Sequence, residues 1–277
     1  MFYGGIMIRM LLDWKDIKTN HVEAKLLIFD LDGALTPSKM PMDREMSELL
    51  HRLLEVKKVA VIGGGKYQKF QEQLLNQLKV REDLLKNLFL FPATASAFYR
   101  YANGSPSTKL RAGWQLVYTE ELTEYEKKKI FEAFEEAFRD LNYSHPEKVF
   151  GELIEDRGSE VTFSALGQEA PLELKKQWKR KHEADKLEIA RKVQEYLPEF
   201  EVRAAGYTSV DVTRKGIDKE YGVRQISKYL DVPIENMIFV GDALFEGGND
   251  EAALKTGITA FSVSGPEETK RVIQSLL

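Results

Sequence analysis

One stretch constrains the fold of this chain more than any other: a short apolar run that ends in two carboxylates and a glycine. It reads Lys25-Leu-Leu-Ile-Phe-Asp30-Leu-Asp32-Gly33. An unbroken apolar run of this length is typical of a strand that is buried on both faces of a parallel sheet. Two aspartates at the end of such a strand are costly to bury unless a cation meets them. Because ligands bind at the carboxyl ends of strands in open α/β folds, Asp30 and Asp32 are candidate site residues.

Strands and helices alternate along the chain on both sides of a long insertion. The elements expected outside the insertion lie at 25–30, 43–54, 58–62, 70–78, 88–91, 218–230, 237–240, 259–263 and after Pro266. Helical spacing of leucines follows Asp43, a residue suited to cap a helix, and Pro266 is well placed at a helix start. This order predicts an α/β fold with a Rossmann-like, doubly wound parallel sheet.

The insertion breaks that alternation. Its expected elements are paired strands at 99–101, 114–118, 149–154, 160–163, 200–204 and 208–212, with helices at 122–138 and 183–196. Paired strands with helices between them favour a separate α+β layer. With 277 residues, the chain is long enough for two domains. We predict a core from residues 1–92 and 217–277, in which 1–20 form an N-terminal extension, and an inserted domain at 93–216.

The composition excludes several classes of function. Lysine and arginine number 40 against 44 acidic residues, so the charge balance does not favour nucleic acid. A basic stretch at Lys175–His182 is followed by acids, which is typical of a solvated helix. The chain has no cysteine, which excludes disulfides and thiolate metal sites. The apolar residues 1–14 are too few to span a bilayer and lack the features of a signal peptide. We therefore expect a cytoplasmic protein that does not bind membranes.

Four polar features fall at strand ends of the predicted core. They are the pair Asp30 and Asp32, the loop Gly63, Gly64 and Gly65, the lysine Lys219, and Gly241-Asp242 followed by Asn249-Asp250. Each feature alone also occurs as an ordinary turn or helix cap. Together they combine carboxylates suited to Mg²⁺, backbone N–H groups suited to phosphate, and a point charge. This combination indicates phosphoryl transfer.

The motif Phe29-Asp-Leu-Asp-Gly33, with the three later features, resembles the haloacid dehalogenase superfamily of phosphatases and phosphotransferases. The resemblance implies that Asp30 is the nucleophile and a Mg²⁺ ligand. It implies that Asp32 is the general acid and base, and that its main-chain carbonyl is a second ligand. Asp242 then completes the metal site, and Lys219 holds the phosphate.

The same resemblance extends to the loop after Asp242 and to the insertion. It places Asn249 and Asp250 in the shell around metal and phosphate. The insertion is similar to the large α/β cap of the superfamily's subfamily IIB, which carries substrate specificity.

A narrower resemblance is to the eukaryotic-type phosphomannomutases. It is carried by the segments Glu155–Gly158, Ser209–Lys219, Gly241–Asp250 and Gly265–Arg271. It implies that Arg157 grips the distal phosphate of a sugar, and that Ser209 and Asp211 hydrogen-bond the hexose. From the residues alone, Arg157 is equally a turn residue on a solvated face, and Ser209 and Asp211 are an edge-strand pair. A homodimer through the cap is a further implication; a monomer is the alternative.

This chain departs from the phosphomannomutase pattern at four positions. Gly65 stands where that family carries a hydroxyl residue, and Lys66 where it carries an acid. Ala34 stands where the family carries threonine, and Gln168 where it carries a second cap arginine. Losing a bidentate phosphate clamp weakens the distal end of the site. We therefore predict a Mg²⁺-dependent phosphohydrolase that acts on a small phosphorylated metabolite, a sugar phosphate, through an aspartyl-phosphate. The alternatives are a hexose phosphomutase and a non-catalytic sugar-phosphate-binding protein.

Overall fold

The computed structural model describes residues 11–13, 24–102 and 113–277. The chain forms two compact units. Unit 1 runs to Thr119 and resumes at Ile217–Leu277, and unit 2 is Glu120–Gly216. Each unit has its own sheet and its own apolar core. In the part of the chain that the structure describes, no helix is both long and apolar enough to cross a membrane.

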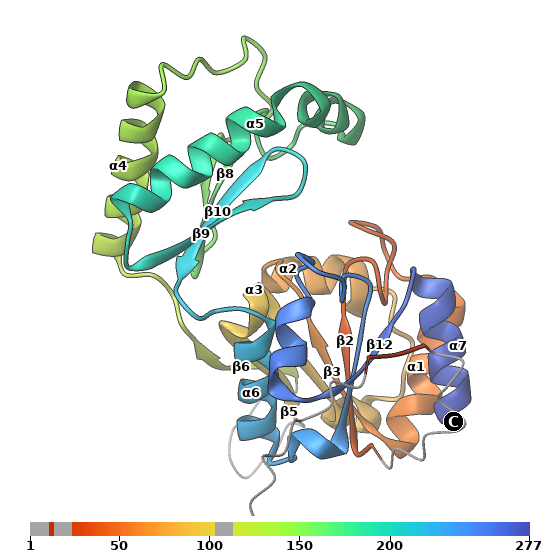
Figure 1. Ribbon diagram of the computed structural model, residues 1–277. Coiled ribbons are helices and arrows are strands. Elements are labelled where there is room, and N and C mark those ends of the chain that lie inside the picture. Colours follow the sequence, from red (N-terminus) through yellow and green to blue (C-terminus); the bar gives the residue numbers. More distant parts are fainter. Residues whose placement is uncertain (1–10, 14–23, 103–112) are drawn as a thin grey trace, which may run out of the picture. The chain divides into compact units, whose positions relative to one another are not determined.

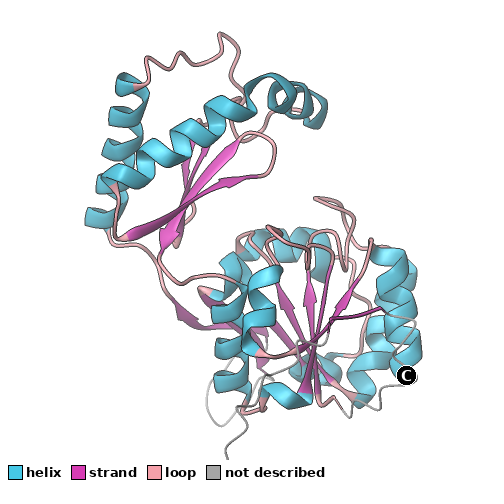
Figure 2. Cartoon of the chain, in the orientation of Figure 1, coloured by secondary structure: helices cyan, strands magenta, loops and turns pink. Residues whose placement is uncertain are grey.

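Unit 1 is built on one large sheet, seen in Figures 1 and 2. Its described strands are, in sheet order, β1 (Leu11–Asp13), β12 (Thr259–Ser262), β11 (Met237–Gly241), β2 (Leu26–Asp30), β3 (Lys58–Ile62), β4 (Leu88–Phe91), β5 (Ala97–Ala102) and β6 (Gly113–Thr119). Neighbours from β1 to β4 are parallel, and β5 and β6 add an antiparallel edge. The α/β fold with a doubly wound parallel core is therefore confirmed.

Helices cover both faces of this sheet. They are α1 (Arg44–Val56), α2 (Tyr67–Phe70), α3 (Pro92–Ala95), α6 (Lys219–Leu230) and α7 (Pro266–Leu276), with the π-helical turn η2 (Gln71–Leu75) and the 3-10 turns η3 (Glu82–Asn87), η4 (Ile234–Asn236) and η5 (Glu251–Thr256). Along β2, Leu27 and Phe29 pack on the side of α1 and α7, whereas Leu26 and Ile28 pack on the side of α6. Burial on both faces explains why this strand reads as one continuous apolar run.

Local sequence signals fix the ends of two core helices. The side chain of Asp43 accepts a hydrogen bond from the Met46 N–H and caps α1, as predicted. The Asp218 side chain accepts from the Tyr221 N–H and caps α6. Because Asp218 is the cap, Lys219 is the first residue of α6 and stands at the end of the helix that carries partial positive charge.

A left-handed turn follows β4. Ala93, Thr94 and Ala95 have φ values of 49°, 55° and 64°, which L-residues other than asparagine and aspartate seldom adopt. The Ala93 and Thr94 N–H groups donate to the carbonyls of Gly65 and Gly63, both at 2.9 Å. This turn therefore braces the glycine loop that follows β3.

Unit 2 is a four-stranded antiparallel sheet with helices on one face. The strands are, in sheet order, β7 (Ile154–Asp156), β8 (Glu160–Ser164), β10 (Ser209–Arg214) and β9 (Phe200–Ala205). The helices α4 (Glu124–Asp140) and α5 (Leu172–Tyr196) bury the apolar side of this sheet. A capping box of Thr123 and Glu126 starts α4. The opposite side of the sheet carries polar side chains.

The structure differs from the expected organisation at three places. The strands β5 and β6, expected in the insertion, belong to the sheet of unit 1, so the inserted unit begins at Glu120 rather than at residue 93. The strand expected at 149–154 is instead formed by Ile154–Asp156, the residues that pair with β8. The helix expected at 183–196 begins at Leu172, and its basic first half buries Lys175 and Trp178 rather than being wholly solvated.

The N-terminal extension is described in part. Leu11–Asp13 forms β1, which pairs in parallel with β12 at the edge of the large sheet. Residues 1–10 and 14–20 of the predicted extension lie outside the described residues.

Candidate active site

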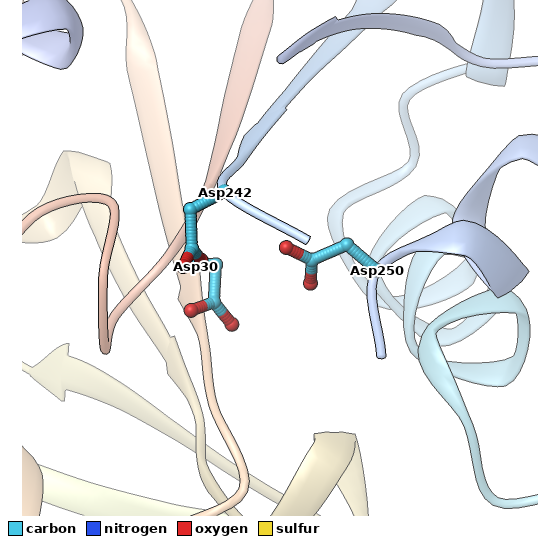
Figure 3. A group of neighbouring side chains, drawn as sticks. All are labelled: Asp30, Asp242 and Asp250. Atoms are coloured by element: carbon cyan, nitrogen blue, oxygen red, sulfur yellow. The ribbon is translucent and has the colours of Figure 1, made fainter. Parts of the chain in front are cut away.

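Three aspartates meet at the carboxyl edge of the parallel sheet. Asp30 ends β2 and Asp242 follows the neighbouring strand β11, so parallel pairing brings the two side chains together. Asp250 approaches from the residue before η5. One carboxylate oxygen from each lies within 4.8 Å of the other two. Figure 3 shows Asp30 and Asp242 side by side with the carboxylate of Asp250 facing them.

Two glycines make this convergence possible. A Cβ atom on Gly33, whose φ is 96°, would overlap the carboxylate of Asp242. A Cβ atom on Gly241 would likewise overlap a carboxylate oxygen of Asp250. Glycine is therefore required at both positions by close approach, and at Gly33 also by its backbone conformation.

Lys219 is the cation of this group. Its ammonium is hydrogen-bonded to Asp30 and lies 3.1 Å from Oδ1 of Asp250. The side chains of Lys219 and Asp30 are 2% and 4% exposed, so this ion pair is buried. One lysine against three carboxylates leaves the group with excess negative charge.

Burial and the neighbouring carboxylates together shift the pKa values of this group. Burial raises the pKa of Asp30 to about 7; Lys219 opposes this rise, and Asp250 and Asp242 add to it. Burial also raises the pKa of Asp242, and the charge of Asp250 raises it further. Burial by itself lowers the pKa of Lys219, but Asp30 and Asp250 raise it above its ordinary value. These are the signs of a site that is short of a cation.

Asp32 is held apart from these three aspartates by hydrogen bonds of its own. Its Oδ1 accepts from the Lys39 N–H at 2.7 Å and from Nε2 of Gln73 at 2.9 Å. Gln73 is not among the site residues predicted from the sequence. The available signal was a polar residue three positions after Phe70, on the apolar face of the predicted helix.

The glycine loop presents backbone N–H groups at the end of β3. Because the Gly63 and Gly65 carbonyls point to the left-handed turn, the N–H groups of Gly64 and Lys66 in the same trans peptides point away from it. Gly63 donates to the Phe91 carbonyl at 3.3 Å, which ties the loop to β4. An arrangement of this kind suits a phosphate oxygen.

Arg157 lies in unit 2, in the turn between β7 and β8, and is surrounded by acceptors. It donates to Glu155 at 2.7 Å, to Glu160 at 3.0 Å and to Oε1 of Gln168 at 3.0 Å. It is not a solvated turn residue, since its side chain is only 23% exposed. Gln168, the residue in place of a second arginine, therefore contacts Arg157 directly.

Asp211 and Ser209 lie two positions apart on β10 and so share a face of the sheet. Asp211 pairs across the sheet with Thr162 on one side and Arg203 on the other. Burial raises the pKa of Asp211 to about 7; Glu160 adds to the rise, and Arg157 opposes it. The structure thus brings Asp211 close to the Arg157 group.

Asn249 is the predicted site residue with the least support. It is exposed, on the loop between Asp242 and η5, whereas the neighbouring Asp250 is fully buried. A carboxylate oxygen of Asp250, which the resemblance assigns to an outer shell, lies within 4.8 Å of oxygens of Asp30 and Asp242.

The donor set of the three aspartates fits a hard divalent cation. All of the atoms that converge are carboxylate oxygens, which Mg²⁺ prefers, and the group carries uncompensated negative charge. Nitrogen and sulfur ligands, which zinc prefers, are absent from this group.

Solved structures with the same fold define the class of protein. An N-terminally truncated, IMP-bound IMP-nucleotidase from Plasmodium falciparum aligns over 95% of this chain and 71% of its own, with a TM-score of 0.66 and 16% identity. A haloacid dehalogenase-like hydrolase from Bacteroides thetaiotaomicron aligns over 92% of this chain and 100% of its own, with a TM-score of 0.60 and 14% identity. The fold is that of the haloacid dehalogenase superfamily.

Sequence comparison is more specific. The family model for eukaryotic phosphomannomutase matches residues 46–277. A phosphomannomutase from Schizosaccharomyces pombe is 29% identical over 252 residues, which cover 88% of this chain and 91% of that protein. A probable phosphomannomutase from Caenorhabditis elegans is 26% identical over 262 residues, 91% of this chain and 95% of that protein. The chain belongs to the eukaryotic phosphomannomutase family, and it is a phosphotransferase of the haloacid dehalogenase superfamily.

Proposed function

We propose that this protein is a Mg²⁺-dependent hexose phosphomutase of the phosphomannomutase type. The observation that carries the proposal is the convergence of Asp30, Asp242 and Asp250 around the buried Lys219. The family comparison supports the mutase over the phosphohydrolase that the sequence alone favoured, since the relatives named phosphomannomutase align over about nine tenths of their length.

In this mechanism Asp30 attacks the phosphorus of a sugar phosphate. A bond forms from its carboxylate oxygen to phosphorus, and the bond from phosphorus to the sugar oxygen breaks. Asp32 gives a proton to the departing sugar oxygen. It later takes a proton from the acceptor hydroxyl, whose oxygen forms a bond to phosphorus while the bond from phosphorus to Asp30 breaks. Lys219 and the N–H groups of the glycine loop hold the negative oxygens of the transferring group.

The metal would be held by Asp30 and Asp242, together with the main-chain carbonyl of Asp32, and Asp250 would support it. When bound, Mg²⁺ supplies positive charge that offsets the charge of the phosphoryl oxygens. Haloacid dehalogenase enzymes in general use this ion, and the carboxylate group described above fits it.

Residues of unit 2 bind the remainder of the sugar in this proposal. Ser209 and Asp211 offer hydrogen bonds to hydroxyl groups, and Arg157 offers charge to a second phosphate. The inserted unit then determines which sugar is accepted, as the resemblance to a large cap implies.

Hydrolysis is a second candidate, and one observation favours it. Arg157 is already paired with Glu155 and Glu160, and Gln168 provides no second positive charge. A distal phosphate would have to compete with two carboxylates for the guanidinium. A substrate with a neutral distal end would not compete with these carboxylates. Water would then be the acceptor for the phosphoryl group.

One assay separates the two candidates. The protein is given mannose 1-phosphate, Mg²⁺ and a catalytic amount of a hexose bisphosphate, and both isomerised sugar and free phosphate are measured. The mutase proposal predicts mannose 6-phosphate with little free phosphate. Free phosphate released in proportion to the sugar consumed would instead establish a phosphohydrolase. If neither isomerised sugar nor free phosphate forms, and Asp30→Asn binds the sugar as well as the wild type does, the protein is a sugar-phosphate-binding protein.

A further inference from the structure

The general acid and base of this site is held by a glutamine from a distant part of the core. We propose that Gln73 is a positioning residue that orients the carboxyl group of Asp32 for proton transfer to and from the sugar oxygen. This inference rests on the proposed aspartyl-phosphate chemistry and adds a residue to it. All of the groups involved belong to unit 1.

The contacts define which oxygen of Asp32 is fixed. Nε2 of Gln73 and the N–H of Lys39 both donate to Oδ1, at 2.9 and 2.7 Å. Two donors on one oxygen set the rotation of the carboxyl group about its Cβ–Cγ bond. The other oxygen, Oδ2, is then the atom that exchanges the proton.

The backbone around Gln73 is unusual in a way that serves this contact. Residues Gln71–Leu75 form a π-helical turn, closed by the Asn76 N–H donating to the Gln71 carbonyl at 2.8 Å. Such turns are rare and occur often at functional sites. Gln73 is buried on the same face as Phe70 and Leu74, which belong to the apolar core.

The main chain of the same residue anchors the loop that carries Asp32. The Gln73 carbonyl accepts from the Met42 N–H at 2.7 Å, where the chain leaves this loop and approaches α1. Gln73 thus ties the loop through its backbone and Asp32 through its side chain. A side-chain substitution leaves the backbone hydrogen bond in place, so the two contributions can be separated.

Packing alone gives no reason for an amide at this position. Gln73 is 4% exposed, and its Oε1 is buried without a hydrogen-bond partner among the described residues. Burying an unpaired amide oxygen is unfavourable, whereas an apolar side chain of the same length would fill the space without that penalty. Gln73 is therefore a poor residue for stability, and it contacts the proton donor. Such a residue is expected where function rather than stability determines the amino acid at a position.

The test compares two phosphate esters in wild type, Gln73→Met and a matched control. The control is Gln71→Met, an exposed glutamine on the same turn. One ester is p-nitrophenyl phosphate, whose leaving group departs without protonation, and the other is a hexose phosphate, whose alkoxide must be protonated. Single-turnover phosphorylation of the enzyme is measured for both, together with thermal stability.

We expect Gln73→Met to slow phosphorylation by the hexose phosphate at least about 10-fold, since general acid–base catalysis is worth ~10²–10⁴-fold. The rate with p-nitrophenyl phosphate should change less than about 3-fold, because its leaving group departs without protonation. The melting temperature should equal or exceed that of the wild type, and Gln71→Met should behave as wild type. Gln73→Asn, whose amide is one methylene too short to reach Asp32, should show the same selective loss.

Two results would overturn the inference. Equal losses with both esters, accompanied by a lower melting temperature, would make Gln73 a structural residue. Unchanged rates with both esters would show that Asp32 needs no partner. Failure of the aspartyl-phosphate chemistry gives a different result, because the wild type, the control and the Gln73 variants would then all form no phosphoenzyme with either ester.

Discussion

Two groups of charged residues in this protein have the same formal charge and different geometries. The core cluster is Lys219 with Asp30, Asp242 and Asp250, and the sheet cluster is Arg157 with Glu155, Glu160 and Asp211. Each has one cation and three carboxylates, and in each an aspartate has its pKa raised to about 7, chiefly by burial.

The difference lies in where the carboxylates point. In the core cluster they face one another within 4.8 Å, so a cation is needed between them. In the sheet cluster Glu155 and Glu160 bind separate nitrogens of one guanidinium, whose five N–H groups can satisfy several acceptors at once. A count of charges therefore does not tell whether a cluster binds a ligand, whereas the direction of its donors and acceptors does.

The largest expected effect is at the nucleophile. Asp30→Asn removes the attacking oxygen's charge and should lower turnover by more than ~10³-fold, because no covalent intermediate can form. Glu155→Gln, a matched change in the sheet cluster, should keep the rate of enzyme phosphorylation within ~3-fold of wild type, since it touches no reacting group. Single-turnover kinetics with a phosphate ester measure both. Comparable losses in the two variants would remove the distinction between the clusters.

Metal binding should distinguish the clusters next. Mg²⁺ at 100 times its dissociation constant should stabilise the folded protein by about 2.7 kcal/mol, seen as a rise in melting temperature that EDTA reverses. Asp242→Asn should abolish this rise and Glu160→Gln should keep it. A rise that survives Asp242→Asn would place the metal outside the core cluster.

A second arginine should convert the sheet cluster into one that needs an anion. Gln168→Arg places a positive charge beside Arg157 and should lower the KM for a hexose bisphosphate about 10-fold, within the usual value of a charge-assisted hydrogen bond. The control, Gln177→Arg, adds the same charge at an exposed position of α5. If both variants lower KM equally, the effect is long-range attraction and not a clamp.

The smallest expected effect is the pH dependence of the sheet cluster. Burial, followed by Glu160, raises the pKa of Asp211 from 3.8 to about 7, so between these pH values the folded state holds a proton that the unfolded state has lost. The stability that the raised pKa of Asp211 contributes is therefore complete below about pH 4 and is lost as the pH rises to about 7. The free energy of unfolding falls over this range by less than ~1.4 kcal/mol per pH unit.

Asp211→Asn should remove this part of the slope, which urea unfolding at a series of pH values with excess Mg²⁺ would detect. An identical slope in the variant and the wild type would show that Asp211 titrates normally.

The sequence predicted which side chains meet at the edge of the core sheet, because parallel sheets follow simple rules. Asp30 and Asp242 both follow apolar strands, and parallel strands place their carboxyl ends along one edge. Lys219 was found through its place in the motif order, and the structure puts it at the start of α6 beside Asp30. Which of these residues bind metal and phosphate remains part of the proposal.

Other features depend on contacts that a sequence pattern does not show. The sequence of β5 and β6 is that of an ordinary β-hairpin, and only the pairing of β5 with β4 assigns the two strands to unit 1. Gln73 occupies a π-helical turn, which has no reliable sequence signature, and its partner Asp32 is 41 positions away. The pairing of Gln168 with Arg157 requires knowledge of how the turn after β7 folds back.

The edge of the large sheet has a consequence for how the protein behaves while it folds. Leu11–Asp13 covers the outer side of β12, a strand with an apolar centre. Without this short strand, β12 would present unpaired N–H and C=O groups to other chains, which is a common start of aggregation. Removing the first 20 residues should therefore reduce recovery of soluble protein after refolding more than it reduces the activity of the molecules that do fold.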